Sequence, residues 1–383
     1  MTAVDHSERI FINRNTAVAL PEAASDREPL AFHQRLPGYA PTPLQEAPGI
    51  AHDLGLDQLW IKDESERMGL PAFKILGASW AVFRAIRQKL SKHDDATSEL
   101  FDWQTLDDLA RQLDPLKPLT LTCATDGNHG RAVARMARLL GLGAHIFVPS
   151  DMAPARQAAI ASEGARVTVI DGTYDDAVAR SAQEADDRSL VISDTSWPGY
   201  EDVPRWVIEG YSTIFWEVED ELRRRGEPGP DLVAVQIGVG ALAAAVVRHF
   251  RSPDVQPKPF ILGVEPTHAA CVLASMEAGE IVQIPGPHDS IMSGLNCGLP
   301  SAIAWPLVSR GIGAYVAIED ERAREAMRAL AREGIVAGEC GAAGLAGLTA
   351  WLRSFGGAGT GRRALVISTE GATDPEAYRQ IVP

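Results

Sequence analysis

Short apolar runs rich in β-branched residues alternate with amphipathic helical patterns along most of this 383-residue chain. Strands that are apolar along their whole length are buried on both faces, so the alternation predicts parallel sheets with helices on both sides and an α/β fold. The predicted strands span residues 119–123, 144–148, 166–170, 190–193, 232–237, 260–264, 314–318 and 363–367. The predicted helices span residues 128–140, 154–164, 174–186, 204–225, 241–250, 268–278, 320–333 and 342–355.

Composition narrows the class of protein. Apolar residues make up 45% and charged residues 23% of the chain, as in soluble globular proteins. The net charge of −15 argues against a nucleic-acid or membrane partner. Four cysteines form no CxxC pair and no histidines cluster at zinc spacing, so we expect no metal site and a reduced, cytoplasmic protein. The first residues lack the apolar run of a signal peptide.

Two polar segments predict domain boundaries. Residues 91–98 are polar and follow a strong helical pattern, and residues 193–204 are rich in Gly, Pro and Asp. We therefore expect a small domain at residues 96–193. Residues 1–95 and 194–383 would form the large domain.

A lysine opens one of the helical patterns. Lys74 follows a loop after a strand that ends near Lys62, and its sequence neighbours include Phe73, Ile75 and Leu76. Apolar surroundings disfavour an ammonium, so such a lysine can serve as a nucleophilic amine or a base. It could equally be a lysine at a helix start whose amine reaches solvent. This segment alone leaves both interpretations open.

A polar loop joins the strand at residues 119–123 to the next helix. It contains Asp126, Gly127, Asn128 and His129. Backbone N–H groups in such a loop can converge on an anion such as a carboxylate. A plain helix N-cap needs only one of these polar residues, so we expect this loop to bind a ligand.

A glycine turn follows the strand at residues 232–237. Gly238, Gly240 and Ala243 match the dinucleotide-binding fingerprint, and Glu265 ends the next strand where a ribose-binding acid would lie. The same geometry suits any phosphate held by backbone amides at a helix N-terminus, and tight strand–helix packing also requires glycines. A nicotinamide-dependent oxidoreductase therefore stays open as an alternative.

The last predicted strand ends in hydroxyl groups. Ser368 and Thr369 are followed by Glu370 and Gly371. Ligands in open α/β sheets bind beyond the carboxyl ends of strands, which is where these hydroxyls lie. A turn with an ordinary cap is the plainer interpretation.

Taken in order, these segments resemble the fold-type II pyridoxal-phosphate enzymes, the group of the threonine and serine dehydratases and the tryptophan synthase β subunit. Within the group, the chain is most similar to the diaminopropionate ammonia-lyase family, from Pro41 to Tyr378. Asp126 is typical of that family, whereas dehydratases usually have serine in this loop. The resemblance implies two open, twisted, mostly parallel sheets with helices on both faces, and an active site between a large and a small domain.

The resemblance also implies roles for individual residues. Lys74 would hold pyridoxal 5′-phosphate and then act as a base, and Asn128 would bind its phenolic oxygen. Ser368 or Thr369 would bind its pyridine nitrogen. The residues implied around its phosphate are Gly238, Val239, Gly240, Ala241 and Leu242. The residues implied at the substrate carboxylate are Thr125, Asp126, Gly127, Asn128 and His129.

The reaction implied is α,β-elimination of D- and L-2,3-diaminopropionate to pyruvate and ammonia, by a protein that in this family is usually a homodimer. Asp126 matches an aspartate that takes the proton from the D-enantiomer, while Lys74 would serve the L-enantiomer. Asp194 matches a second acid facing the β-amino group, although it could equally cap the turn at residues 197–201. His129 is expected to be a packed histidine rather than an acid or base.

Some details depart from the family pattern. Ala337 and Cys340 stand where serines are more usual, which leaves the substrate open. A serine or threonine dehydratase, or another lyase of β-substituted alanines, is therefore an alternative. Cys271 and Cys297 flank a Pro/Gly-rich loop and are expected to be free buried thiols, which an oxidising setting could pair.

Overall fold

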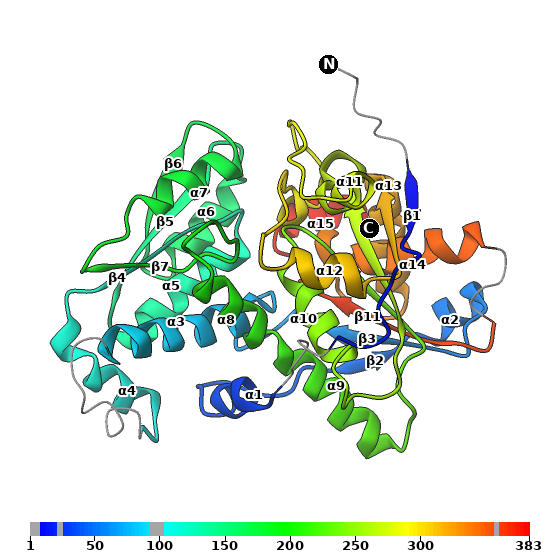
Figure 1. Cartoon of the computed structure of the whole chain (residues 1–383), viewed down its shortest axis with the longest axis horizontal. Coiled ribbons are helices and arrows are strands. Elements are labelled where there is room, and N and C mark those ends of the chain that lie inside the picture. The colour runs from blue at the N-terminus through cyan, green and yellow to red at the C-terminus, as the bar shows by residue number, and fades with distance from the viewer. Residues whose placement is uncertain (1–7, 21–25, 92–102, 356–359) are drawn as a thin grey trace. The chain divides into compact units, whose positions relative to one another are not determined.

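The computed structural model describes residues 8–20, 26–91, 103–355 and 360–383 (Figure 1). The chain divides into two compact units. The first comprises Met1–Asp26, Pro41–Glu66 and Ile214–Pro383, and the second comprises Arg27–Ala40 and Arg67–Thr213. Each unit is built around its own sheet.

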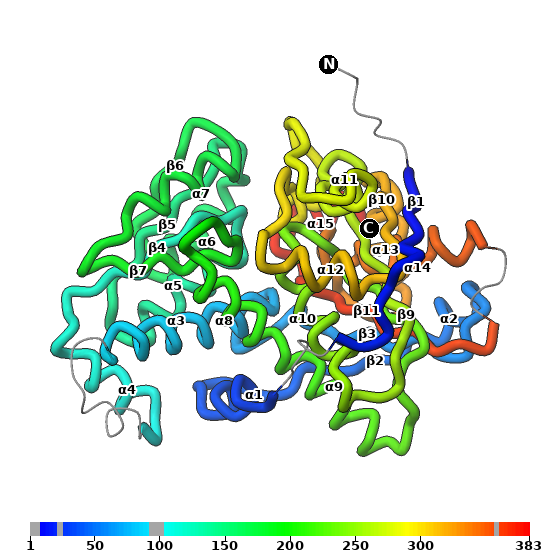
Figure 2. The backbone as a smooth tube through the Cα atoms, in the orientation of Figure 1, coloured from blue at the N-terminus to red at the C-terminus, as the bar shows by residue number. Residues whose placement is uncertain are grey.

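The first unit contains a seven-stranded sheet of order β1-β10-β9-β8-β11-β3-β2. The five inner strands are parallel, and the two edge strands β1 and β2 are antiparallel to their neighbours. Figure 2 shows the chain entering this sheet at β1, beside β10. The strands are β1 (Arg9–Ile12), β2 (Leu44–Glu46), β3 (Gln58–Asp63), β8 (Leu232–Gln236), β9 (Phe260–Pro266), β10 (Ala314–Ile318) and β11 (Arg363–Ser368).

The inner strands of this sheet are buried on both faces, as the continuous apolar runs predict. In β8, Leu232 and Ala234 belong to the apolar cluster shared with α14, while Val233 and Val235 point to the opposite face and are also buried. The helices of this unit are α2 (Pro48–Leu54), α9 (Ser212–Arg225), α10 (Ala241–Phe250), α11 (Cys271–Ala278), α12 (Trp305–Gly311), α13 (Asp320–Arg332), α14 (Glu339–Ser354) and α15 (Pro375–Ile381).

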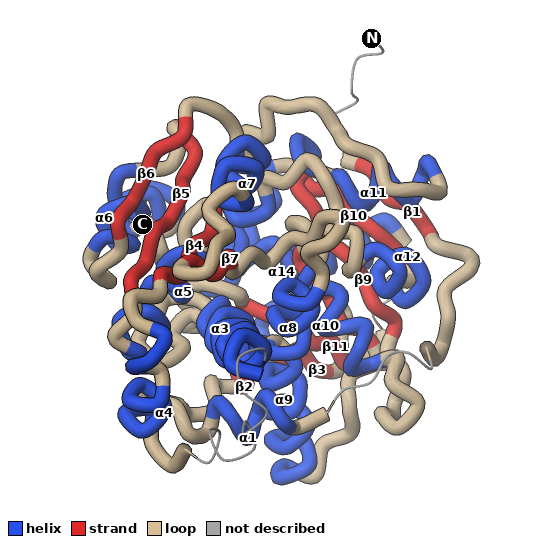
Figure 3. Tube along the Cα trace, turned by 60° about the vertical axis from the view of Figure 1, so that its left-hand side comes forward, coloured by secondary structure: helices blue, strands red, loops and turns tan. Residues whose placement is uncertain are grey.

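The second unit contains a four-stranded parallel sheet of order β6-β5-β4-β7 (Figure 3). Phe147 of β5 packs with Ala177 of α7 on one face, and Ile146 meets α5 on the other. The strands are β4 (Thr120–Ala124), β5 (Gly143–Pro149), β6 (Arg166–Ile170) and β7 (Ser189–Val191). The helices are α1 (Glu28–His33), α3 (Lys74–Ser91), α4 (Leu106–Gln112), α5 (Asn128–Leu140), α6 (Pro154–Ala161), α7 (Tyr174–Ala182) and α8 (Asp202–Gly210).

The boundaries of the units differ from the domains predicted at residues 96–193 and on either side. The second unit begins earlier and ends later, because α3 packs against both α5 and α8. Lys74 therefore lies in the same unit as the Asp126 loop. Most of the predicted boundary at residues 91–98 lies outside the described residues.

The sequence predicts one continuous helix at residues 204–225, and this prediction is wrong. Residues 204–225 form two helices, α8 and α9, which meet at Tyr211. Gly210 at the junction packs against α3, where a Cβ atom would lie 2.5 Å from the carbonyl oxygen of Leu76. Helical periodicity continues across the junction, so the sequence does not reveal this close approach.

Within the described residues, no helix combines the length and the apolar content needed to cross a membrane.

Candidate active site

Lys74 and Asp194 form an ion pair in the second unit. Lys74 is the first residue of α3, and Asp194 follows β7. The Lys74 Nζ donates to Asp194 Oδ2 at 2.7 Å. Burial opposes the ammonium, but the carboxylate outweighs it and raises the pKa of Lys74 above its ordinary value. Lys74 is therefore not a solvated lysine at a helix start: it is a charged group aimed inward.

Asp194 has further polar neighbours. The Tyr174 hydroxyl donates to its Oδ1 at 3.3 Å, and the Nδ1 of His129 lies 4.0 Å from its Oδ2. Burial alone would raise the pKa of this carboxyl, but the Lys74 ammonium holds it well below the usual range. The carboxylate is thus fixed as an anion that faces a cation, which is more than capping of the turn at residues 197–201 requires.

The predicted carboxylate-binding loop lies in the same unit. Thr125 Oγ1 accepts from the backbone N–H groups of Gly127 and Gly130 at 2.9 and 3.0 Å, so this hydroxyl shapes the turn into α5. Asn128 opens α5 and is partly exposed. Burial raises the pKa of the Asp126 carboxyl against the opposing charge of Lys74, and a higher pKa makes a carboxylate a stronger base.

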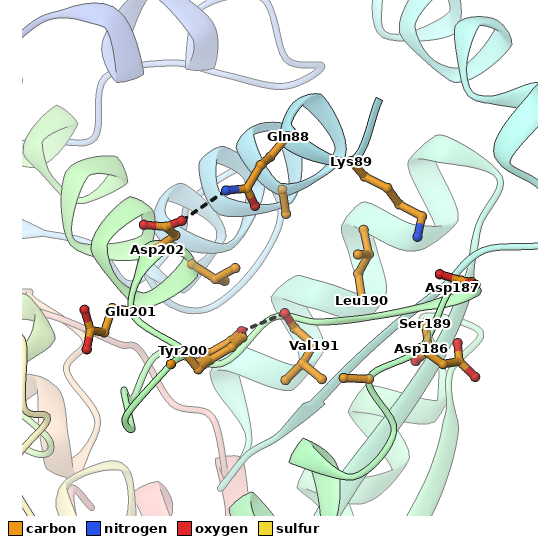
Figure 4. A pocket seen from close by; sticks show the side chains of 14 residues that line it. Gln88, Lys89, Asp186, Asp187, Ser189, Leu190, Val191, Tyr200, Glu201 and Asp202 are labelled. Atoms are coloured by element: carbon orange, nitrogen blue, oxygen red, sulfur yellow. Dashed lines mark hydrogen bonds between the residues drawn. The ribbon is translucent and has the colours of Figure 1, made fainter. Parts of the chain in front are cut away.

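A tyrosine holds the segment that leads to Asp194. The Tyr200 hydroxyl donates to the carbonyl of Val191 at 2.6 Å and accepts from the Ser193 N–H at 3.0 Å, the first of which Figure 4 shows. The same view shows the side chains that line a pocket beside Tyr200, among them Gln88 and Asp202, which are joined by a hydrogen bond. The volume of this pocket is about 720 Å³. None of the predicted site residues lines this cavity.

The predicted phosphate-binding loop lies in the first unit, between β8 and α10. Gly240 has φ +101°, which residues with a Cβ atom rarely adopt. A Cβ atom at Gly238 would lie 3.1 Å from the carbonyl oxygen of Gly294. Gly240 is therefore required by its backbone conformation, and a side chain at Gly238 would need the neighbouring backbone to shift. With Val239, Ala241 and Leu242 they form a strand–turn–helix whose backbone N–H groups can hold a phosphate.

Two adjacent hydroxyls in the first unit differ in their partners. Thr369 Oγ1 accepts from the side-chain amide of Gln236 at 2.8 Å, and the same amide donates to the carbonyl of Ile367 at 3.0 Å. Ser368 Oγ, at the end of β11, is buried and has no hydrogen-bond partner among the described residues. Buried hydroxyls are rarely left unpaired, so Ser368 is the better candidate for a ligand.

Glu265 does not have the position that a ribose-binding acid needs. It ends β9 as the sequence predicts, but its two carboxyl oxygens accept from the N–H groups of Val272 and Leu273 at 2.8 Å each. It is completely buried and anchors the start of α11. The structure therefore removes the main support for the oxidoreductase alternative.

All four cysteines are buried, and none of them forms a disulfide. Cys271 Sγ lies 3.8 Å from the carbonyl oxygen of Gly238, and Cys297 also borders this glycine. Both are buried thiols, as expected from the sequence. Cys271 and Cys297 form no disulfide here.

Sequence reasoning missed Tyr174, Tyr211 and Gln236. Tyr211 is buried beside Lys74, and its ring packs against Phe73 with 4.7 Å between ring centroids. No local pattern distinguishes these residues from ordinary core residues. Their contacts depend on chain segments far apart in the sequence.

Comparison with known proteins gives consistent matches. Residues 35–370 match the model of a family described as "Pyridoxal-phosphate dependent enzyme". The diaminopropionate ammonia-lyase of Salmonella typhimurium is 36% identical, with 96% of this chain and 94% of that protein covered. The Escherichia coli diaminopropionate ammonia-lyase is 34% identical, with 99% and 96% covered.

Solved structures agree with these matches. A crystal structure of Escherichia coli diaminopropionate ammonia-lyase in complex with D-serine superposes with a TM-score of 0.87 and 32% identity, covering 98% of this chain and 97% of that one. A threonine deaminase from Solanum lycopersicum superposes with a TM-score of 0.73 at 21% identity, covering 97% and 91%, which is a likeness of fold.

Proposed function

The chain belongs to the pyridoxal-phosphate dependent enzymes, and from this premise we propose that it eliminates ammonia from 2,3-diaminopropionate to give pyruvate and a second ammonia. The observation that carries the proposal is the Asp194 carboxylate, which is buried and already holds an ammonium group at 2.7 Å. A second amino group is what distinguishes diaminopropionate from serine and threonine. Near-full-length similarity to two diaminopropionate ammonia-lyases supports this choice.

The residues present fit pyridoxal phosphate. Ser368 offers a buried hydroxyl without a partner, which suits the pyridine nitrogen, whereas Thr369 is already bonded to Gln236. The loop at residues 238–242 offers backbone amides at the start of α10. Lys74 would carry the cofactor through its amine, and Asn128 would bind the phenolic oxygen. When bound, the cofactor supplies the electron sink that stabilises the charge left after a proton leaves Cα.

The chain's own residues bind the substrate and move its protons. Thr125 and the N–H groups of residues 126–129 would hold the substrate carboxylate. Lys74 would take the Cα proton of the L-enantiomer and Asp126 that of the D-enantiomer, because a single base cannot reach both faces of Cα. Asp194 would face the β-amino group.

The first experiment is to record the visible absorbance of the purified protein and to assay pyruvate from each enantiomer of 2,3-diaminopropionate. We expect a yellow protein, loss of the band with borohydride, and pyruvate from both enantiomers. A yellow protein that releases pyruvate from serine or 2-oxobutyrate from threonine, and nothing from diaminopropionate, would be a dehydratase. A colourless protein that gains no colour with added pyridoxal phosphate would contradict the cofactor assignment.

A substitution tests whether Asp126 and Lys74 act as bases on different enantiomers. Asp126→Asn should abolish turnover of the D-enantiomer and spare much of the L-activity, because Lys74 remains. Equal losses on the two enantiomers would count against a base role for Asp126. Asp107→Asn, at an exposed residue of α4, is a matched control and should change neither activity.

We also propose that the protein is a cytoplasmic homodimer. The resemblance to the family and the acidic, cysteine-poor composition support this. Size-exclusion chromatography with light scattering should give twice the 41.1 kDa mass of one chain. A mass of one chain at micromolar concentration would contradict it.

A further inference from the structure

The tautomer of His129 is set by its surroundings. His129 is the second residue of α5 and is 1% exposed. Its Nε2 lies 2.7 Å from the backbone carbonyl oxygen of Ile192, and a carbonyl oxygen only accepts, so Nε2 carries the proton. Burial lowers the pKa of the ring, which favours its neutral form. In a neutral ring with a protonated Nε2, Nδ1 is a lone-pair acceptor.

This acceptor faces a second acceptor. Nδ1 of His129 has no hydrogen-bond partner among the described residues and lies 4.0 Å from Asp194 Oδ2. The charged groups that face the ring are Asp194 and Lys74. An ammonium nitrogen can donate to two acceptors 4.0 Å apart, because each bond then needs about 2.8 Å. Lys74 occupies only one of them, at Asp194 Oδ2.

We propose that His129 helps to determine substrate specificity: the β-ammonium group of the substrate donates one N–H to Asp194 Oδ2 and another to His129 Nδ1. This inference rests on the proposed function, in which Lys74 carries the cofactor and so leaves the carboxylate of Asp194 without its cation. A buried carboxylate and a buried lone pair then require a donor with at least two hydrogens. An ammonium group has three.

The paired acceptors also favour departure of the β-amino group. Lys74 or Asp126 takes the Cα proton, the electron pair left on Cα forms the Cα=Cβ bond, and the Cβ–N bond breaks with its pair on nitrogen. A group held as –NH₃⁺ leaves as neutral NH₃ and needs no further proton. Two acceptors stabilise that charged form.

The same geometry discriminates against serine. A hydroxyl has one hydrogen, so serine can satisfy Asp194 or His129 but leaves the other unpaired. An unpaired buried polar group lowers binding by about ten- to a hundredfold. A site with Asp194 alone would not impose this difference.

Two variants of His129 test the proposal. We compare kcat/KM for 2,3-diaminopropionate with kcat/KM for serine, or with the inhibition constant of serine where its turnover is too slow. His129→Leu should lower the preference for diaminopropionate about tenfold or more. His129→Gln keeps an acceptor oxygen and should recover part of it. An unchanged preference in His129→Leu, with an active parent, would overturn the proposal.

A second measurement is made on the unmodified protein and does not depend on enzyme activity. ¹⁵N-histidine NMR, with His129→Gln to assign the resonance, should show a neutral ring protonated at Nε2 at pH 7. A charged ring, or a proton on Nδ1, would overturn the proposal. A parent enzyme that fails to turn over diaminopropionate, whatever the NMR result, would instead remove the proposed function on which the inference rests.

Discussion

Two lysines, one in each unit, pair with a carboxylate at nearly the same distance but in different surroundings. Lys62 of β3 is 1% exposed, and its Nζ donates to Glu217 Oε2 at 2.6 Å and to the carbonyl of Thr42 at 2.7 Å. Glu64 Oε1 lies 3.9 Å from the same Nζ. An ammonium has three N–H groups, so Lys62 is almost fully satisfied.

Lys74 is bonded less completely. Its side chain is 21% exposed, and its Nζ donates to Asp194 Oδ2 at 2.7 Å. Donors remain available, and part of the side chain is open to a ligand. The comparison indicates two roles for a lysine–carboxylate pair. A lysine whose N–H groups are almost all bonded, such as Lys62, stabilises the fold, whereas a lysine with N–H groups still available, such as Lys74, can take part in a reaction.

The sharpest test of this comparison is removal of Lys74. Lys74→Ala should abolish the cofactor absorbance and lower kcat/KM at least about ten-thousandfold, as loss of a catalytic nucleophile or base does. Lys62→Ala should keep the absorbance in whatever fraction of the protein is folded. A coloured, active Lys74→Ala variant would refute its assignment.

Removal of Lys62 should lower the stability of the protein rather than its cofactor absorbance. Lys62→Met leaves Glu217 and Glu64 buried without their cation, which should lower the free energy of unfolding by about 3–5 kcal/mol. Urea unfolding followed by circular dichroism measures it. The double variant Lys62→Met/Glu217→Leu should recover much of the loss, since a buried pair can be replaced by apolar residues at little cost. No recovery would show that Lys62 acts by packing rather than by charge.

Glu265 extends the comparison to a carboxylate held by amides instead of a lysine. Burial raises its pKa to about 8, against the two amide hydrogen bonds. The folded protein therefore keeps a proton that the unfolded chain loses above its ordinary pKa of 4.5, so this stabilisation is complete below 4.5 and declines as pH rises to about 8. Glu265→Gln should flatten the dependence of unfolding free energy on pH between 5 and 8. Glu280→Gln, at an exposed residue, should not.

The smallest expected effects concern the two adjacent hydroxyls. Thr369→Val breaks the bond to Gln236 and should cost about 1 kcal/mol of stability. Ser368→Ala removes a hydroxyl with no partner, so it should leave stability unchanged and weaken binding of pyridoxal phosphate up to about tenfold. Fluorescence titration of the apoprotein measures the second. A loss of stability in Ser368→Ala, or weaker cofactor binding in Thr369→Val alone, would contradict the different roles given to the two hydroxyls.

The sequence predicts those parts of the fold that depend on local pattern. The predicted helices at residues 128–140 and 241–250 match α5 and α10, and the predicted strands at 166–170 and 314–318 match β6 and β10. The edge strands β1 and β2 were not predicted, because runs of four and three residues are too short to show a period.

The sequence predicts which residues belong to the candidate site, but it does not predict which of them contact one another. Lys74 and Asp194 stand out by their neighbours in the sequence, but their ion pair joins residues 120 positions apart. Glu265 lies at the strand end that the sequence indicates and yet serves α11, because only the folded chain shows which N–H groups reach it. Tyr174 and Gln236 have no local pattern that would mark them.

The ion pair of Lys62 also constrains the order in which the chain can fold during synthesis. Its partner Glu217 is 155 residues later, and Arg67–Thr213, most of the second unit, is translated in between. β11, which lies between β8 and β3, is the last strand to leave the ribosome. The sheet of the second unit can therefore form before β11 is available to pair with β3. A ribosome stalled before residue 363 would hold a chain with a complete four-stranded sheet and a second sheet that lacks the strand between β8 and β3.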